Sequence, residues 1–383
     1  RSSDLNDVDD PDRTSDIMEV IDCYSAIYPS LKRHSKGFPD VNYLRSIVKR
    51  GQEKSNMSGV GEGKDSPGSE LIVAAVDKKD DSRPVWLAAW SGMNTIAQAI
   101  WKVHATRSPE EFQKFTAKIR IYDVLGQDDA GAWIAKSFPE IYYIRNKEIY
   151  GWGPSDEWII ENVQSKKPFG TCYPDRIWAS EGDSPSFLYV YANGLNVPDS
   201  LTYGGWGGRF NAERTAGIRG MDFIEKSGKN EGMYDPYFMH ASSKEGIAAI
   251  NKWRQHILND FAARMNWTTT DKFSEANHHP VAVIENDSTF NCLNRVVKAG
   301  SLGVFDATSS YDPDGDELDY RWFVYKEPSS YKGEVQLNVD EQGICCLRMP
   351  KEASGKNIHL ILELSDSGVP QLTSYRRIVI HVK

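Results

Sequence analysis

The sequence lacks the features that define several classes of protein. No run of roughly 18 apolar residues occurs, which excludes a membrane-spanning helix. No block of about five like charges occurs, and the net charge of −9 is unsuited to a polyphosphate partner. Residues 1–10 are polar and lack the apolar centre of a signal peptide. We therefore expect no membrane span and no nucleic-acid polymer as partner, while the compartment stays open.

Cysteine is sparse, and its spacing matches no metal or redox motif. The five cysteines are Cys23, Cys172, Cys292, Cys345 and Cys346, with no CxxC pair and no zinc spacing. Either Cys292 pairs with Cys345 or Cys346, or these thiols stay reduced and buried. The sequence also lacks the Gly-x-Ser-x-Gly, His-Glu-x-x-His and phosphate-loop motifs. The cysteines decide nothing, and these common catalytic motifs are excluded.

What is present indicates a globular chain of two domains. The 383 residues are 40% apolar and 26% charged, a composition typical of folded proteins and a length too great for one ordinary core. Aromatic residues are abundant, with 11 Trp and 18 Tyr. This abundance suits either stacking on sugar or base rings or a well-packed core.

The first two thirds of the chain alternate strands with helices. Apolar periodicity predicts a helix over 16–28 that ends at Pro29. The continuous apolar run at 83–90 predicts a strand buried on both faces, and further strands are expected at 118–124 and 141–144. Helices between them complete a mostly parallel α/β sheet with flanking helices. Ligands of such sheets bind at the carboxyl ends of the strands.

The pattern of apolar residues changes after residues 277–280. Short alternating runs follow, separated by turns, as in an all-β sandwich. These runs are 281–284, 303–306, 320–325, 358–364 and 377–382. We therefore expect an α/β domain over 1–274 and a β-sandwich over 275–383.

The segment 307–322, ATSSYDPDGDELDYRW, resembles the polycystic-kidney-disease-type, immunoglobulin-like modules of secreted carbohydrate-active proteins. The resemblance implies that Trp322 lies in the core between two sheets and that the protein is secreted, periplasmic or on the cell surface. It also offers two functions for Asp312, Asp314 and Asp316. They either bind calcium or sugar or form an Asx-stabilised turn, and we favour the turn.

Four motifs in the first domain resemble the nucleoside-hydrolase-like family of bacterial proteins, one relative of which is described as cellulose-binding. The matching stretches are 90–99 (WSGMNTIAQA), 126–131 (GQDDAG), 181–189 (EGDSPSFLY) and 204–209 (GGWGGR). The resemblance implies a nucleoside-hydrolase-like α/β fold. It also implies a glycoside or N-ribosyl hydrolase in which calcium assists attack of water at an anomeric carbon.

The chain departs from true nucleoside hydrolases at its start. In those enzymes an Asp-rich loop after the first strand binds calcium and supplies the general base. This sequence begins after the position of the second strand, so we expect the first βα unit to be missing. No buried strand precedes Asp7, Asp9, Asp10 and Asp12, which we interpret as a solvated loop. Enzymatic activity is therefore expected only if the Asp-rich loop is present.

Five site residues are predicted, some from the resemblance and others from their positions in the chain. Asp183 is expected to bind a calcium ion, although a turn or capping role suits the same position. Asn94 either contacts sugar hydroxyls or caps the helix that follows it. Asp128 and Glu62 are expected on the ligand side, with helix capping and a solvated loop as their alternatives. Trp206, between paired glycines, is expected to be exposed and to stack on a sugar ring. The chain is thus either a calcium-dependent glycosidase or a non-catalytic carbohydrate-binding protein.

Overall fold

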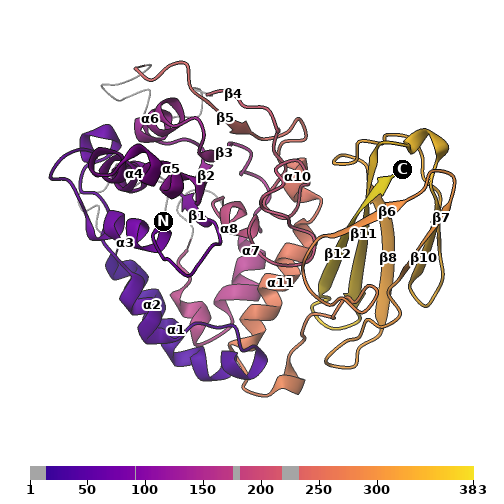
Figure 1. The fold of residues 1–383 in the computed structure, drawn as a ribbon. Coiled ribbons are helices and arrows are strands. Elements are labelled where there is room, and N and C mark those ends of the chain that lie inside the picture. Colours follow the sequence, from indigo (N-terminus) through magenta and orange to yellow (C-terminus); the bar gives the residue numbers. More distant parts are fainter. Residues whose placement is uncertain (1–13, 91, 176–181, 218–232) are drawn as a thin grey trace.

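The computed structural model describes residues 14–90, 92–175, 182–217 and 233–383. Figure 1 shows an α/β part followed by a smaller part built of strands. The α/β part contains a five-stranded sheet in the order β1-β2-β3-β5-β4. Neighbouring strands from β1 to β5 pair in parallel, whereas β4 pairs antiparallel to β5. The predicted parallel α/β sheet with flanking helices is confirmed.

The α/β part contains strands that alternate with helices as the sequence predicts. Its strands are β1 (Val85–Ala89), β2 (Ile119–Val124), β3 (Tyr142–Asn146), β4 (Thr215–Ala216) and β5 (Phe238–Ala241). Its helices are α1 (Thr14–His34), α2 (Val41–Ile47), α3 (Pro67–Val76), α4 (Asn94–Thr106), α5 (Pro109–Ala117), α6 (Asp129–Ser137), α7 (Asp156–Ile159), α8 (Pro185–Leu188), α10 (Ala248–Asn251) and α11 (Arg254–Trp267). One-turn elements include η1 (Asn56–Gly59), η3 (Phe169–Cys172) and η5 (Phe273–Glu275).

Strand β1 differs from the prediction that it is buried on both faces. It lies at one edge of the sheet, and most of its residues are only half-buried. Strand β2 lies between two neighbours and is almost completely buried. The prediction for β1 was wrong because an apolar run reports hydrophobicity and does not report which strand lies at the edge.

Helix α1 continues through Pro29, where the sequence predicted its end. Ile27 and Leu31 on either side of the proline pack against Trp267 of α11, so tertiary contacts hold the helix together. A disulfide joins Cys23 of α1 to Cys172 of η3. Cys292, Cys345 and Cys346 are free thiols, which agrees with one of the two alternatives the sequence left open.

The C-terminal part consists of two sheets that pack face to face (Figure 1). Strands β6 (Leu293–Val297), β12 (Thr373–Val382), β11 (Asn357–Asp366) and β8 (Leu318–Tyr325) form one sheet in that order. Strands β7 (Leu302–Asp306), β10 (Ile344–Arg348) and β9 (Leu337–Val339) form the other. Trp322 is buried in the core between them, where its indole N–H donates to the carbonyl of Gly343 at 3.1 Å. The segment 281–284, predicted as a strand, forms only isolated bridges.

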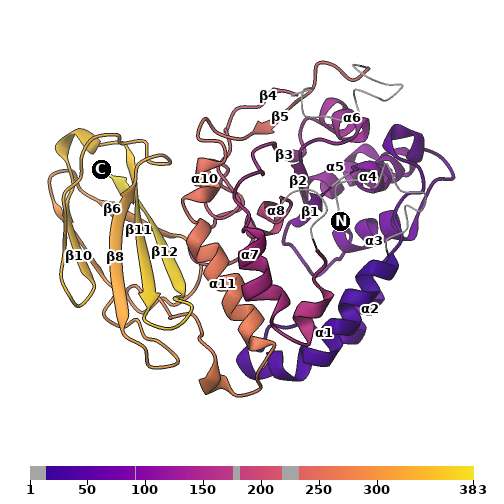
Figure 2. The same ribbon diagram turned by 180° about the vertical axis from the view of Figure 1, so that it is seen from behind.

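The two parts share a core. Figure 2 shows α11 between the α/β part and the sheet that contains β12, as does the opposite view. Trp253 and Trp206 from the α/β side pack there against Tyr375 and Tyr325 of the strands. The backbone N–H groups of Tyr375 and Arg377 also donate to the carbonyls of Asn193 and Gly194. Two backbone hydrogen bonds therefore join a segment of the α/β part to strand β12.

Candidate functional site

The carboxyl ends of β1 and β2 lead into the turns that contain most of the predicted site residues. After β1 the chain passes through Gly92 and Met93 into α4, which begins at Asn94. After β2 it passes through Gln127 and Asp128 into α6. Both turns lie at the same edge because β1 and β2 run in parallel. Ligands of open α/β sheets are expected at this edge.

Asp128 joins the beginnings of two helices. Its Oδ1 accepts hydrogen bonds from the backbone N–H groups of Ala130 and Gly131, at 3.0 and 3.2 Å, and so caps α6. Its Oδ2 accepts from the N–H of Met93 before α4, at 2.7 Å. The side chain is fully buried, and this burial raises the pKa of the Asp128 carboxyl to about 7. These contacts agree with the helix-capping alternative for Asp128, and its contact with a ligand stays a prediction.

Asn94 ties α4 to the Gly-rich loop at 50–66. Its amide Nδ2 donates to the carbonyl of Lys54 at 2.7 Å, and its Oδ1 accepts from the N–H of Thr95 at 3.0 Å. One turn later on α4, the buried Gln98 accepts from the N–H of Gly61 and donates to Asp65. Asn94 and Gln98 therefore fix the conformation of this loop from one face of α4. Gln98 was not among the predicted site residues. Its signal in the sequence is a polar residue at helical spacing among the apolar positions of α4.

The Gly-rich loop surrounds a cavity of about 510 Å³ whose lining mixes polar and apolar surface and includes the charged residues Arg50, Glu53, Lys54, Lys64 and Asp65. Lys64 keeps the loop closed, since its Nζ donates to the carbonyls of Ser58 and Val60, both at 2.9 Å. Side chains and backbone of the loop supply the walls, and no aromatic residue is among them. Glu62 lies exposed on this loop and is not part of the cavity wall. The volume lies within the range of small-molecule sites, and the lining suits a ligand rich in hydroxyl groups.

Asp183 lies half-buried in the turn before α8. Its carbonyl accepts from the hydroxyl of Ser186 at 2.8 Å, and that hydroxyl accepts from the indole N–H of Trp90 at 2.6 Å. Trp90 directly follows β1, so this chain of hydrogen bonds places Asp183 beside the carboxyl end of the sheet. Glu181, at the start of the same motif, lies outside the described residues.

Trp206 occupies a different place from the one predicted. Its side chain is 1% exposed and stacks on Tyr191, and its indole N–H donates to the hydroxyl of Tyr375 at 3.3 Å. The prediction of an exposed stacking platform was wrong, because the glycines around Trp206 allow close packing instead of exposure. Trp152 is buried in the same core, and Trp178 lies outside the described residues.

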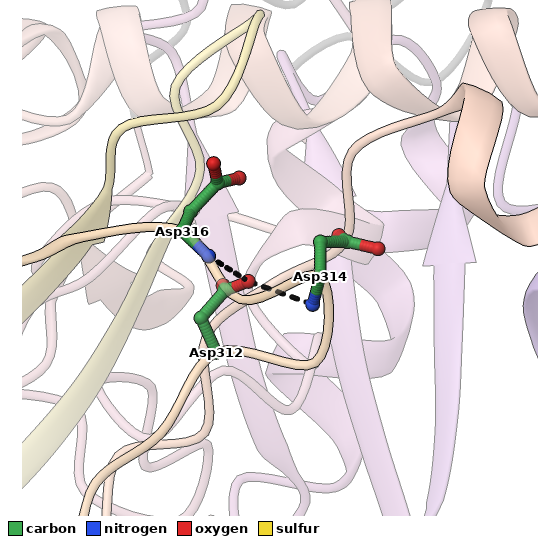
Figure 3. Close-up of side chains that lie close together, drawn as sticks. All are labelled: Asp312, Asp314 and Asp316. Carbon is green, nitrogen blue, oxygen red and sulfur yellow. Dashed lines mark hydrogen bonds between the residues drawn. The ribbon is translucent and has the colours of Figure 1, made fainter.

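The Asp-rich turn of the β part is held by its own hydrogen bonds. Asp312 Oδ1 accepts from the backbone N–H groups of Asp314 and Asp316, at 2.8 and 3.2 Å (Figure 3). The carboxylate of Asp314 accepts from both the backbone N–H and the imidazole of His278, at 2.8 and 3.1 Å. These contacts are those of an Asx-stabilised turn that also anchors the connection between the two parts.

A calcium ion needs several oxygen ligands gathered within a few ångströms. Across the described residues, the acidic, His and Cys side chains that come together in this way are Asp312, Asp314 and Asp316. Among the described residues, no group of three acidic, His or Cys side chains comes together around Asp183. The role of Asp183 as a calcium ligand therefore stays a prediction.

Comparison with known proteins places the chain in a family. Residues 2–210 match the family model "Cellulose-binding Sde182, nucleoside hydrolase-like domain". Residues 304–382 match "Cellulose-binding protein Sde0182, C-terminal domain". The chain belongs to this family. The predicted resemblance to nucleoside-hydrolase-like proteins is thereby confirmed, whereas no match bears on the polycystic-kidney-disease-type module.

A solved structure that is similar to this chain supports its place in the cellulose-binding Sde182 family. A nucleoside hydrolase-related hypothetical protein from Saccharophagus degradans, associated with carbohydrate metabolism, is 45% identical, with a TM-score of 0.92. The alignment covers 98% of this chain and 89% of that one. Mouse clustered PcdhgC3 EC1-3 aligns over 27% of this chain and 34% of its own, at 15% identity and a TM-score of 0.18, and we infer nothing from it. No curated protein matched.

Proposed function

We propose that this chain is a carbohydrate-binding protein whose ligand site lies at the carboxyl end of the parallel sheet, around the β1–α4 turn. The observation that carries the proposal is the cavity of about 510 Å³ in the Gly-rich loop, which Asn94 and Gln98 hold against α4. The wall combines charged side chains such as Arg50 and Glu53 with serine hydroxyls, an amide and backbone groups, all of which can form hydrogen bonds with the hydroxyl groups of a sugar. Family membership supports the same ligand class, because the matching models are named for cellulose binding.

The proposed site is extracytoplasmic. Support comes from the disulfide between Cys23 and Cys172, since such bonds persist in oxidising compartments. A secreted, periplasmic or surface-attached protein that binds glycans is consistent with this disulfide. No helix among the described segments has the length and apolar character needed to cross a membrane.

A second candidate function is hydrolysis of a glycoside or N-riboside. It is favoured by membership in a nucleoside-hydrolase-like family and by the position of Asp183 at the ligand edge. Of the described residues at this edge, however, the carboxyl of Asp128 is occupied by backbone groups, and calcium ligands do not gather around Asp183. Binding without turnover is therefore the function that the geometry supports best.

The experiment is titration calorimetry of the purified chain with cellohexaose, together with an assay for new reducing ends and a nucleoside panel, each with and without calcium. We expect saturable binding of cellohexaose and no release of sugar or base. Turnover that requires calcium would establish the hydrolase instead. The absence of binding to cellohexaose and to xylan, mannan and chitin oligosaccharides would overturn the carbohydrate proposal.

A further inference from the structure

Two exposed aromatic rings lie beside Asp183 at the carboxyl end of β1. Trp90 is 43% exposed and Phe187 of α8 is 48% exposed. Their ring centroids are 6.4 Å apart, and the ring planes meet at 56°. Figure 1 and Figure 2 both show α8 next to β1, so the pair is formed by neighbouring elements. Two large rings of adjacent elements thus present apolar surface to solvent at the edge where a ligand is expected.

The orientation of Trp90 is fixed by a specific contact. Its indole N–H donates to the hydroxyl of Ser186, which in turn donates to the carbonyl of Asp183. Ser186 is itself buried, so this hydrogen bond is shielded from water and holds the ring in one position. A fixed ring loses little conformational freedom when a ligand covers it. An exposed ring held in this way is suited to binding, whereas a ring exposed by chance needs no such anchor.

The position of the pair connects it to the cavity. Trp90 lies four residues before Asn94, whose amide holds the carbonyl of Lys54 in the cavity wall. The β1–α4 turn therefore carries an apolar ring at one end and a polar group that shapes the cavity at the other. A ligand that covers Trp90 and reaches the loop at Lys54 would meet both a flat apolar surface and hydrogen-bonding groups. Sugars have this dual character, because hydroxyl groups point outward from a ring whose faces carry C–H groups.

We infer that Trp90 and Phe187 form a stacking subsite for a neutral β-linked glucan, an inference that rests on the proposed carbohydrate-binding function. In β-linked glucose units the hydroxyl groups are equatorial, so both ring faces expose C–H bonds that pack on aromatic rings. Because the two aromatic planes meet at 56°, a flat array of parallel sugar rings cannot lie against both. The subsite therefore takes a single glucan chain or chain end in preference to a crystalline surface.

The test compares cellohexaose binding by calorimetry in the whole chain and in Trp90→Ala, Trp90→Phe and Phe187→Ala variants. The matched control is Phe290→Ala, since Phe290 is 53% exposed but lies in the β part, away from the sheet edge. We expect about tenfold weaker binding for each alanine variant, a smaller loss for Trp90→Phe, which keeps an aromatic ring, and no change for Phe290→Ala. Circular dichroism and thermal melting verify that each variant is folded.

The outcomes separate this inference from the proposed function. Unchanged affinity in folded Trp90→Ala and Phe187→Ala variants, with normal binding by the parent chain, would overturn the stacking subsite and leave carbohydrate binding intact. Failure of the parent chain to bind cellohexaose would overturn the glucan subsite, and failure with every oligosaccharide of the panel would overturn the proposed function as well. A parent chain that binds crystalline cellulose more tightly than cellohexaose would contradict the single-chain geometry.

Discussion

At the scale of single residues, the same side-chain type serves different ends according to its burial. Asp128 and Asp183 both follow turns at the ligand edge, yet Asp128 is fully buried and Asp183 is half-buried. The sequence predicted that Asp128 lies at the start of a helix. It did not reveal that the backbone N–H of Met93 donates a hydrogen bond to the second carboxyl oxygen of Asp128. Trp206 was mistaken for an exposed ring and Trp90 for an ordinary strand residue. Sequence alone does not specify which of two tryptophans beside glycines is covered by a second domain.

Asp128 gives a prediction about the pH dependence of stability. Its pKa is raised to about 7 in the folded chain, so folding binds a proton between about pH 4 and pH 7. The stability that this proton provides is present below pH 4 and is lost as the pH rises toward 7. The replacement Asp128→Asn removes this titratable group. It also places the amide N–H₂ of Asn against backbone N–H donors, which lowers the free energy of unfolding by about 1–3 kcal/mol.

The measurement is the free energy of unfolding in urea at pH 5, 6, 7 and 8, for the parent chain and for Asp128→Asn. We expect the parent to exceed the variant by more at pH 5 than at pH 8. Glu110→Gln is a suitable control, because Glu110 is exposed on the first turn of α5. A difference between parent and Asp128→Asn that stays constant across this range would contradict the raised pKa.

At the scale of elements, periodicity predicted most helices and strands, and contacts between elements decided the exceptions. Helix α1 passes through Pro29 because Ile27 and Leu31 pack on Trp267, a residue more than two hundred positions away. Strand β1 is half-exposed because it lies at the edge of the sheet. Short strands such as β5, β6 and β9 escaped prediction, since three to five residues carry too little pattern. Pairing partners, and the disulfide between Cys23 and Cys172, are likewise products of tertiary structure.

The disulfide gives a prediction at this scale. Cys23 and Cys172 are 149 residues apart in sequence, so the bond closes a long loop and restricts the unfolded chain. We expect the double replacement Cys23→Ser with Cys172→Ser to lower the free energy of unfolding by about 2–4 kcal/mol. Chemical denaturation measures the loss, and dithiothreitol should destabilise the parent chain by a similar amount.

The free thiols provide the control for that experiment. Cys292→Ser leaves the disulfide intact and removes a half-buried thiol without a covalent partner, so it should change stability much less. Labelling of the unfolded, non-reduced parent with a thiol reagent should count three free cysteines. Five labelled thiols, or no effect of reductant on stability, would show that Cys23 and Cys172 are not bonded.

At the scale of the whole molecule, the two parts are joined by backbone as well as by side chains. Gly194 has a φ of 83°, and a Cβ at this position would meet the carbonyl oxygen of Tyr375 at 1.9 Å, so only glycine permits this approach. The buried Arg377 donates to the carbonyls of Leu195 and Gly204, at 2.8 and 2.7 Å. The sequence predicted both parts but not this junction, because the residues that form it are about 180 positions apart.

The junction between the two parts also bears on why we expect the ligand at the carboxyl edge of the α/β sheet. Trp206, which the sequence predicted as a sugar platform, is buried in the shared core together with Trp152. Exposed rings at the described part of the sheet edge include those of Trp90 and Phe187. The Asp-rich turn near the junction is held by its own hydrogen bonds and by His278. These observations support the proposal that a ligand binds at the α/β sheet edge.

Hydrogen–deuterium exchange of the whole chain, with and without saturating cellohexaose, tests this central assignment most directly. Exchange reports local opening of the backbone, and bound ligand slows it where contacts form. If the ligand binds at the α/β sheet edge, we expect slower exchange in peptides that cover residues 50–66, 86–94 and 183–188, and no change in peptides that cover 306–320. Protection confined to 306–320, or to any other segment of the β part, would contradict it.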